Sequence, residues 1–235
     1  MKNRSILFAA VCVVFLGICG LFLTRYPLIQ PVGSFTGASI VFVLDPGHGG
    51  EDGGAVSVSG ASESGINLAV AQKMDLILGL YGKKAVLLRE TDRSLHTEGA
   101  VTLREKKVSD LKNRVRMVNA QSGAVLLSVH QNSYPGQQYW GLQTFYARTE
   151  HSQQLAECMQ KAIQSQLQIE NRRKSKPIPD NVYLMNHVEC PAVLVECGFL
   201  TNPEEEARLR NETYQCKLAA VLTTAAMNWA SLFQI

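Results

Sequence analysis

The chain has 235 residues, of which 46% are hydrophobic and 18% are charged. This length suits one domain with a short appendage, and the composition excludes an intrinsically disordered chain. The formal net charge is only +3 and no long basic run with interleaved aromatic residues occurs, so we expect no nucleic-acid partner.

The N-terminal segment has the pattern of a membrane anchor. Lys2 and Arg4 precede an uninterrupted run of apolar or small residues, 6–23. As a helix, this run would rise about 27 Å, close to the roughly 30 Å hydrocarbon core of a bilayer. The basic flank favours a cytoplasmic N-terminus. We therefore expect residues 1–25 to anchor the chain in the membrane with the remainder outside the cytoplasm. The alternative is cleavage near 36–39, which would give a secreted form.

A linker and an alternation of strands and helices follow the expected anchor. Residues 26–39 contain two prolines and two glycines and predict a linker. Short apolar runs rich in β-branched residues predict strands at 40–44, 85–88, 124–129, 142–146 and 192–195. Apolar residues spaced by three and four predict helices near 66–78, 108–118, 155–167 and 214–232. Residues 40–235 are thus expected to form one three-layer α/β domain, with a mostly parallel or mixed central sheet and helices on both faces.

Three polar clusters follow the expected strands, at the sheet edge where α/β proteins usually carry their chemistry. His48 lies in a loop of five glycines (44–54), which lets the backbone turn sharply and approach a ligand. The lysine and hydroxyl residue of a phosphate-binding P-loop are missing. His130 and Glu196 each end an apolar run, and Glu63 opens the first expected helix, from which it could face the same cleft.

Each of these residues has an ordinary structural interpretation when it is considered alone. A histidine or a glutamate at a strand end is more often a hydrogen-bonding or salt-bridge partner than a functional group. Two histidines and a glutamate expected together at one sheet edge favour a functional interpretation over a structural one. Two histidines and one carboxylate are a ligand set of catalytic zinc, which leaves a fourth position open for water.

Four sequence blocks resemble the signatures of the zinc-dependent N-acetylmuramoyl-L-alanine amidases of the type-3 family. They are, in order, LDPGHGG (44–50), SES (62–64), SVHQN (128–132) and VECGFLTN (195–202). The resemblance covers the chain from about residue 40 to its end. It implies that His48, Glu63 and His130 bind one Zn²⁺ and that Glu196 is the catalytic carboxylate. It also implies that the substrate is peptidoglycan, cut at the amide bond between the lactyl group of N-acetylmuramic acid and L-alanine.

Within this family, the chain particularly resembles amidases required for spore-cortex maturation and germination. The shared plan is one N-terminal anchor, one catalytic domain and no wall-binding repeats, and residues 97–111 and 182–185 also resemble that group. The likeness implies a membrane facing the cortex and cooperation with a muramic acid deacetylase in forming muramic-δ-lactam. The alternatives are a zinc peptidase acting on stem peptides, a general vegetative wall-remodelling amidase, and a degenerate amidase that only binds wall glycan.

Several smaller features carry expectations of their own. Cys197 stands where the family usually has a small apolar residue or threonine, and we expect a buried side chain rather than a nucleophile. Asp45 either orients a ligand histidine or serves as a turn residue before Pro46. The basic run 172–176 either meets the acidic stem peptide or is a solvated loop. Local ion pairs are expected between Arg89 and Asp92 and between Arg114 and Asp110.

Overall fold

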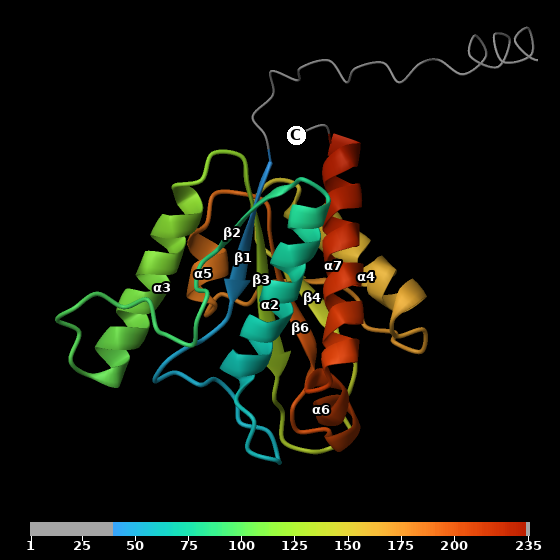
Figure 1. Cartoon of the computed structure of the whole chain (residues 1–235), viewed down its shortest axis with the longest axis horizontal. Coiled ribbons are helices and arrows are strands. Elements are labelled where there is room, and N and C mark those ends of the chain that lie inside the picture. Colours follow the sequence, from blue (N-terminus) through green and yellow to red (C-terminus); the bar gives the residue numbers. More distant parts are fainter. Residues whose placement is uncertain (1–39, 234–235) are drawn as a thin grey trace, which may run out of the picture. The chain divides into compact units, whose positions relative to one another are not determined.

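The computed structural model describes residues 40–233 (Figure 1). The expected anchor (1–25) and linker (26–39) lie outside these residues, so both stay predictions. Within the described part of the chain, no helix combines the length and the apolar character needed to span a membrane.

Six strands form one mixed sheet in the order β2-β1-β3-β6-β4-β5. The neighbours β2, β1, β3 and β6 run parallel to one another, whereas β4 is antiparallel to β6 and parallel to β5. The strands are β1 (Val41–Pro46), β2 (Lys84–Leu87), β3 (Ala124–Asn132), β4 (Gln143–Tyr146), β5 (Lys176–Pro177) and β6 (Ala192–Phe199). The mixed sheet confirms the expected fold class, and only the two-residue β5 was not anticipated.

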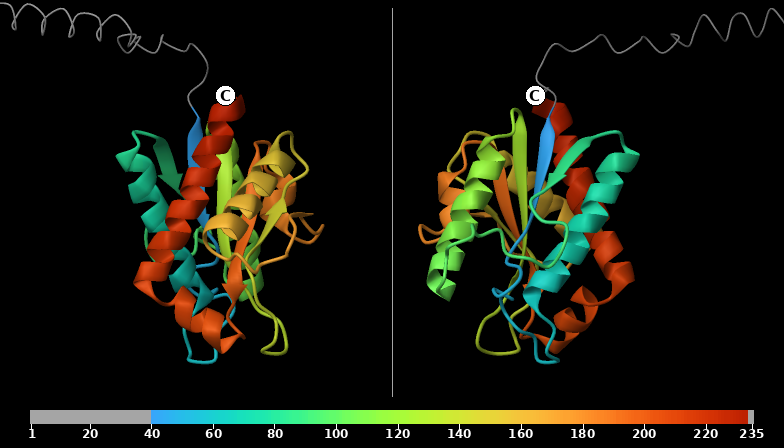
Figure 2. Two further views of the ribbon diagram at one scale, coloured as in Figure 1. Left: turned by 90° about the vertical axis from the view of Figure 1, so that its right-hand side faces the viewer. Right: turned by 60° about the vertical axis from the view of Figure 1, so that its left-hand side comes forward.

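Helices cover both faces of the sheet (Figures 1 and 2). One face packs against α2 (Glu63–Leu80), α4 (Ser152–Gln166) and α7 (Glu212–Phe233). The other face packs against α3 (Leu103–Asn119) and the short α5 (Tyr183–His187). Helix α6 (Pro203–Leu209) follows β6 and precedes α7. The α5 turn was not expected, because five residues are too few to show a helical period.

Two helices, α3 and α6, start at residues whose side chains cap the helix. At α3, Thr102 and Glu105 form a capping box, in which each side chain bonds the backbone N–H of the other residue. This box starts α3 at Leu103, five residues before the first apolar position of the expected helix. At α6, the Asn202 side chain accepts bonds from two backbone N–H groups and Pro203 is the first helical residue.

Alternation along the strands determines which face of the sheet carries the polar residues. In β6, Val193 and Val195 pack into the core under α2, α4 and α7, whereas Ala192 and Leu194 pack on the α3 side. Glu196 is the next alternate residue after Ala192 and Leu194, so its side chain points to the α3 face. The same alternation in β3 puts His130 on that face, opposite Glu196 in the register of the two strands.

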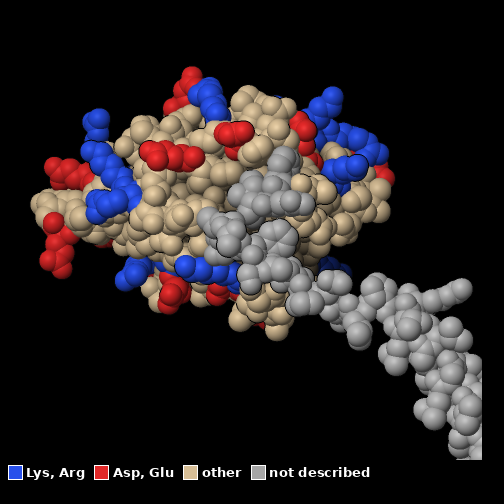
Figure 3. Space-filling view, turned by 90° about the horizontal axis from the view of Figure 1, so that it is seen from above, with Lys and Arg blue, Asp and Glu red and all other residues tan. Residues whose placement is uncertain are grey.

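The opposite end of the sheet, from which β1 starts, carries charged side chains of both signs among its described residues (Figure 3). Seen from that end, Lys and Arg side chains lie among Asp and Glu side chains (Figure 3). The three clusters singled out in the sequence instead lie at the carboxyl ends of β1, β3 and β6.

Candidate metal centre and active site

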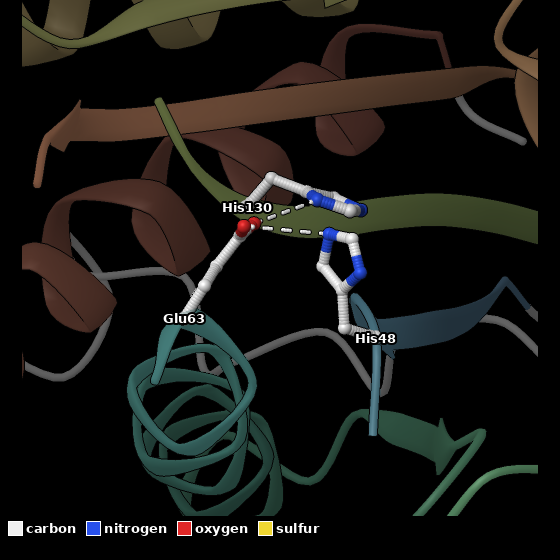
Figure 4. Close-up of side chains that lie close together, drawn as sticks. All are labelled: His48, Glu63 and His130. Atoms are coloured by element: carbon white, nitrogen blue, oxygen red, sulfur yellow. Dashed lines mark hydrogen bonds and ion pairs between the residues drawn. The ribbon is translucent and has the colours of Figure 1, made fainter. Parts of the chain in front are cut away.

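The structure brings His48, Glu63 and His130 together at the carboxyl edge of the sheet (Figure 4). One donor atom from each residue lies within 4.8 Å of the others. His48 Nε2 is 3.4 Å from Glu63 Oε2, and His130 Nδ1 is 3.0 Å from Glu63 Oε1. The two imidazole rings meet edge to face, with centroids 5.0 Å apart. Three donors from three separate elements therefore converge on one point.

Glycines make room for this convergence. A Cβ atom on Gly47 would lie 2.2 Å from the His130 ring, and one on Gly54 would lie 2.5 Å from Glu63 Oε2. Both positions thus exclude any side chain as long as the three donors stay together. His48 itself has a φ of 62°, an uncommon conformation for a residue with a Cβ atom. Strain of this kind persists only where surrounding contacts fix the backbone.

Arg89 supplies the first of those contacts. Its buried guanidinium donates to the carbonyl oxygens of Pro46 (2.9 Å), Gly47 (2.9 Å) and Ser64 (2.8 Å). It therefore ties the loop that carries His48 to the first turn of α2, which carries Glu63. Burial and the neighbouring Arg114 charge lower the pKa of Arg89 to about 10. The expected local ion pair between Arg89 and Asp92 was wrong, because the guanidinium is directed to backbone carbonyls.

Arg114 supplies the second set of contacts, from helix α3. It donates to the carbonyl oxygens of Pro46 (3.0 Å) and His48 (2.7 Å) and forms a buried ion pair with Asp45. Its bond to Asp110 at 2.6 Å confirms the expected local pair. Burial alone would raise the pKa of Asp45, but the Arg114 charge beside it holds that pKa below its usual value.

Asp52, rather than Asp45, is the carboxylate next to a metal-ligand candidate. Asp45 lies within β1 and accepts bonds from Ser128 Oγ (2.6 Å) and Arg114, so both roles considered for it were wrong. Asp52 Oδ1 lies 3.1 Å from His48 Nδ1 and leaves Nε2 to face Glu63. A carboxylate on the second ring nitrogen fixes the orientation and tautomer of a ligand histidine. The sequence signal, an aspartate four residues after His48 in the glycine loop, was overlooked.

The three donors form a site that favours a cation. Burial alone would lower the pKa of His48, but Asp52 and Glu63 raise it to about 9. Burial opposes ionisation of Glu63, yet both histidines hold its pKa well below the usual range. The two imidazole nitrogens and one carboxylate oxygen are chemically suited to binding a metal ion.

Glu196 lies beside these donors without a fixed partner. Its Oε2 atom is buried and has no hydrogen-bond partner within the described part of the chain. Burial raises its pKa to about 7, with His130 opposing the rise and Glu63 adding to it. A buried carboxylate without a partner is costly, and a pKa near neutrality suits a group that gains and loses a proton.

A cleft of about 200 Å³ exposes Glu196 and the two histidines to a substrate. Its floor is the α3 face of the sheet, and its walls come from α3 and the region of α5. The wall residues are Lys107, Asp110, Leu111 and Arg114 on α3, with Val182, Leu184 and Met185 opposite. The chemistry therefore lies at one end of a cleft between two helical elements.

Comparison with known proteins identifies the family. Residues 42–228 match the family Amidase_3, described as N-acetylmuramoyl-L-alanine amidase. The chain belongs to this amidase family. It is 35% identical over 181 residues to the germination-specific N-acetylmuramoyl-L-alanine amidase of Bacillus subtilis, over 77% of this chain and 75% of the relative.

Solved structures agree with this assignment. The CwlD amidase from Clostridioides difficile, determined in complex with the GerS lipoprotein, is 35% identical with a TM-score of 0.79. The match covers 83% of this chain and 100% of that one. An N-acetylmuramoyl-L-alanine amidase from Clostridium difficile 630 is 31% identical with a TM-score of 0.70, over 83% of this chain and 97% of that one.

The family assignment confirms the enzyme class expected from the signature blocks. The amidase hydrolyses the bond between N-acetylmuramic acid and L-alanine in peptidoglycan, a polymer outside the cytoplasmic membrane. Cys197 is fully buried in the core, and burial raises the pKa of its thiol far above the ordinary value. It therefore fits the expected role of a small buried side chain.

Proposed function

We propose that this amidase is zinc-dependent, with His48, Glu63 and His130 as the protein ligands and Glu196 as the catalytic base. The observation that carries the proposal is the convergence of three donors suited to a metal ion beside Glu196, whose buried Oε2 has no hydrogen-bond partner among the described residues. Two histidines and one carboxylate leave a fourth position for water or substrate, as catalytic zinc requires.

The chain's own residues account for the proton transfers. Zinc bound at these ligands supplies Lewis acidity to the attacking water and the scissile carbonyl. Glu196 accepts the proton of that water as the new C–O bond forms at the lactyl carbonyl carbon. Glu196 then donates this proton to the L-alanine nitrogen as the C–N bond breaks. The products are a free lactyl carboxylate and a stem peptide with a free amino terminus.

Residues behind the ligands hold this geometry. Asp52 keeps His48 Nε2 directed at the metal position, and Arg89 ties the His48 loop to the start of α2. Arg114 fixes the His48 carbonyl from the α3 side. Ligands held this way need little rearrangement when the ion binds or the substrate reacts.

Digestion of purified peptidoglycan tests the proposal. The zinc-loaded full chain should release stem peptides that begin with L-alanine, identified by mass spectrometry. Glu196→Gln should keep zinc and lose most of its activity, because the ligands remain while the proton acceptor is gone. Glu189→Gln, at the exposed end just before β6, is the matched control and should behave as wild type.

Two outcomes would contradict the assignment. New amino termini inside the stem would indicate a zinc peptidase, the alternative class. A Glu196→Gln variant that turns over at nearly the wild-type rate would make Glu196 structural.

We propose further that the enzyme acts in spore-cortex maturation, held by residues 1–25 at a membrane facing the cortex. The support is the 35% identity to a germination-specific amidase and the apolar N-terminal run. Stem removal would supply the substrate of a muramic acid deacetylase in forming muramic-δ-lactam. Deleting the gene should therefore leave vegetative growth nearly normal, while spores lack the lactam and germinate poorly. Normal lactam, or chained vegetative cells, would indicate a general wall-remodelling amidase instead.

A further inference from the structure

The connection between β3 and β4 concentrates the exposed aromatic side chains. Residues 133–141, here named the aromatic loop, carry Tyr134, Tyr139 and Trp140, which are 53%, 37% and 44% exposed. Among the residues whose exposure the structure describes, the one other exposed aromatic side chain is Tyr81, at the end of α2. Single exposed aromatic residues are ordinary, but three within seven residues form a patch that suggests binding.

The aromatic loop is fixed before any ligand binds. The Tyr134 and Tyr139 rings meet edge to face at 4.8 Å, and Tyr139 packs on the buried Phe199 ring at 6.2 Å. The Asn202 side chain donates to the carbonyl oxygens of Gln137 (2.9 Å) and Tyr139 (3.2 Å). A surface held in this way loses little conformational entropy on binding.

The backbone of the aromatic loop has a second anchor, in Glu205. Both oxygens of this buried carboxylate accept a bond from the Gly141 N–H, and one of them also accepts from the Phe199 N–H. Glu205 therefore ties the end of the aromatic loop to the end of β6.

The aromatic loop adjoins the active site. It begins three residues after His130 and ends just before Gln143, which pairs with Glu196 across β4 and β6. Arg173 joins the two regions: it donates to Gln143 Oε1 at 3.1 Å, and its guanidinium lies 4.8 Å from the Phe199 ring centroid. The yellow-green loop after β3 projects at the same end of the molecule as the loop that carries His48 (Figure 2).

The composition of the aromatic loop indicates the kind of ligand. Residues 133–141 (SYPGQQYWG) contain no charged side chain, and the guanidinium of the adjacent Arg173 is engaged by the Trp140 carbonyl oxygen (2.8 Å) and Gln143 Oε1 (3.1 Å). The loop itself therefore offers no basic partner to an anionic lipid headgroup. They offer aromatic faces together with the amides of Gln137 and Gln138 and the hydroxyl of Ser133. A neutral sugar presents apolar C–H faces and hydroxyl groups, which match aromatic rings and amides respectively.

We propose that the aromatic loop is a glycan subsite, which holds the sugar chain of peptidoglycan on the β4 side of the scissile bond. The inference rests on the proposed function, because that function places a muramoyl residue at Glu196. It goes further in assigning substrate length: the enzyme prefers glycan strands to single muramoyl peptides.

Kinetics on a long and a short substrate test the subsite. The full chain would be assayed on uncrosslinked glycan strands that carry stem peptides and on N-acetylmuramoyl-L-alanyl-D-isoglutamine, which has one sugar. The double variant Tyr134→Ala/Tyr139→Ala should lose about tenfold in kcat/KM on strands, mainly through KM, and stay within about twofold on the single sugar. Tyr134→Phe/Tyr139→Phe should restore strand activity, and Tyr81→Ala is the matched exposed control.

A binding measurement separates this inference from the amidase proposal. Calorimetry with glycan strands stripped of their peptides should show binding by the wild-type chain, about tenfold weaker in the double alanine variant. Tyrosine-dependent binding by a chain that cleaves neither substrate would overturn the proposed function and leave the subsite intact. An equal loss on both substrates, no loss on strands, or failure of the wild-type chain to bind bare strands would overturn the subsite. The subsite would also be overturned if the chain bound phosphatidylglycerol vesicles through these tyrosines while the double alanine variant kept wild-type kinetics on glycan strands.

Discussion

Replacing Arg114 by methionine tests whether the loop geometry depends on a buried charge. The substitution keeps a side chain of similar length but removes the group that pairs with Asp45 and bonds the His48 carbonyl. Arg114 is 2% exposed and Asp45 is 1% exposed, so water cannot replace the lost partner. Breaking a buried ion pair from one side costs about 3–5 kcal/mol. Because domains of this size have total stabilities of about 5–15 kcal/mol, the loss is a large fraction.

Thermal unfolding of the full chain measures the effect. At pH 7 we expect the melting temperature of Arg114→Met to fall by roughly 10 °C. The difference in melting temperature between the wild type and Arg114→Met should narrow as the pH falls toward 4. In the wild type, Arg114 holds the pKa of Asp45 in the folded chain below its usual value. The ionised Asp45 therefore stabilises the folded wild type at pH values above the usual pKa, and this stabilisation is lost as the pH falls through the lowered pKa. In the variant the Arg114 charge is gone, and only the Ser128 hydrogen bond and the His130 charge still oppose burial, so the pKa of Asp45 rises and its protonation relieves the uncompensated charge.

Arg116→Met provides the control, since Arg116 lies on the same helix but is exposed. Its stability should change by no more than about 0.5 kcal/mol. If Arg114→Met were as stable as this control at pH 7, or if its difference in melting temperature from the wild type did not change with pH, the Arg114–Asp45 pair would not stabilise the loop.

Two further outcomes follow from the site. Gly54→Ala should abolish metal binding, since its Cβ would lie 2.5 Å from Glu63 Oε2. Gly60→Ala is the control, because Gly60 also has a positive φ but has open space around it, and this variant should bind metal. Equal metal content in the two variants would refute the packing argument. The raised pKa of about 9 leaves His48 protonated in the metal-free chain, so zinc binding at pH 7.5 should release about one proton. Calorimetry in buffers of different ionisation enthalpy measures that proton, and buffer-independent heats would contradict the ion-paired His48.

The sequence predicted those parts of the site that depend on strand order alone. His130 and Glu196 end buried apolar runs, and carboxyl ends of neighbouring parallel strands share one edge of a sheet. The glycine-rich loop likewise marked His48. Glu63 was less accessible to such reasoning, because its position depends on how α2 packs, and only the family resemblance assigned it to the metal.

The roles of the two supporting arginines could not be predicted because these side chains act over long sequence distances. Arg89 and Arg114 each had a local acidic neighbour that offered a simple ion pair. Their actual partners include the carbonyl oxygen of Pro46, 43 and 68 residues away in sequence, respectively. Asp52 was missed because its contact with His48 depends on the path of a loop in which His48 itself adopts a positive φ.

Anomalous scattering at the zinc edge, from crystals of the zinc-loaded full chain, would locate the metal directly. We expect a single peak coordinated by His48 Nε2, a Glu63 carboxylate oxygen and His130 Nδ1, with Glu196 beside it but not bound to it. Zinc coordinated by Glu196 in place of Glu63, or a principal peak away from these three residues, would contradict the proposed metal site.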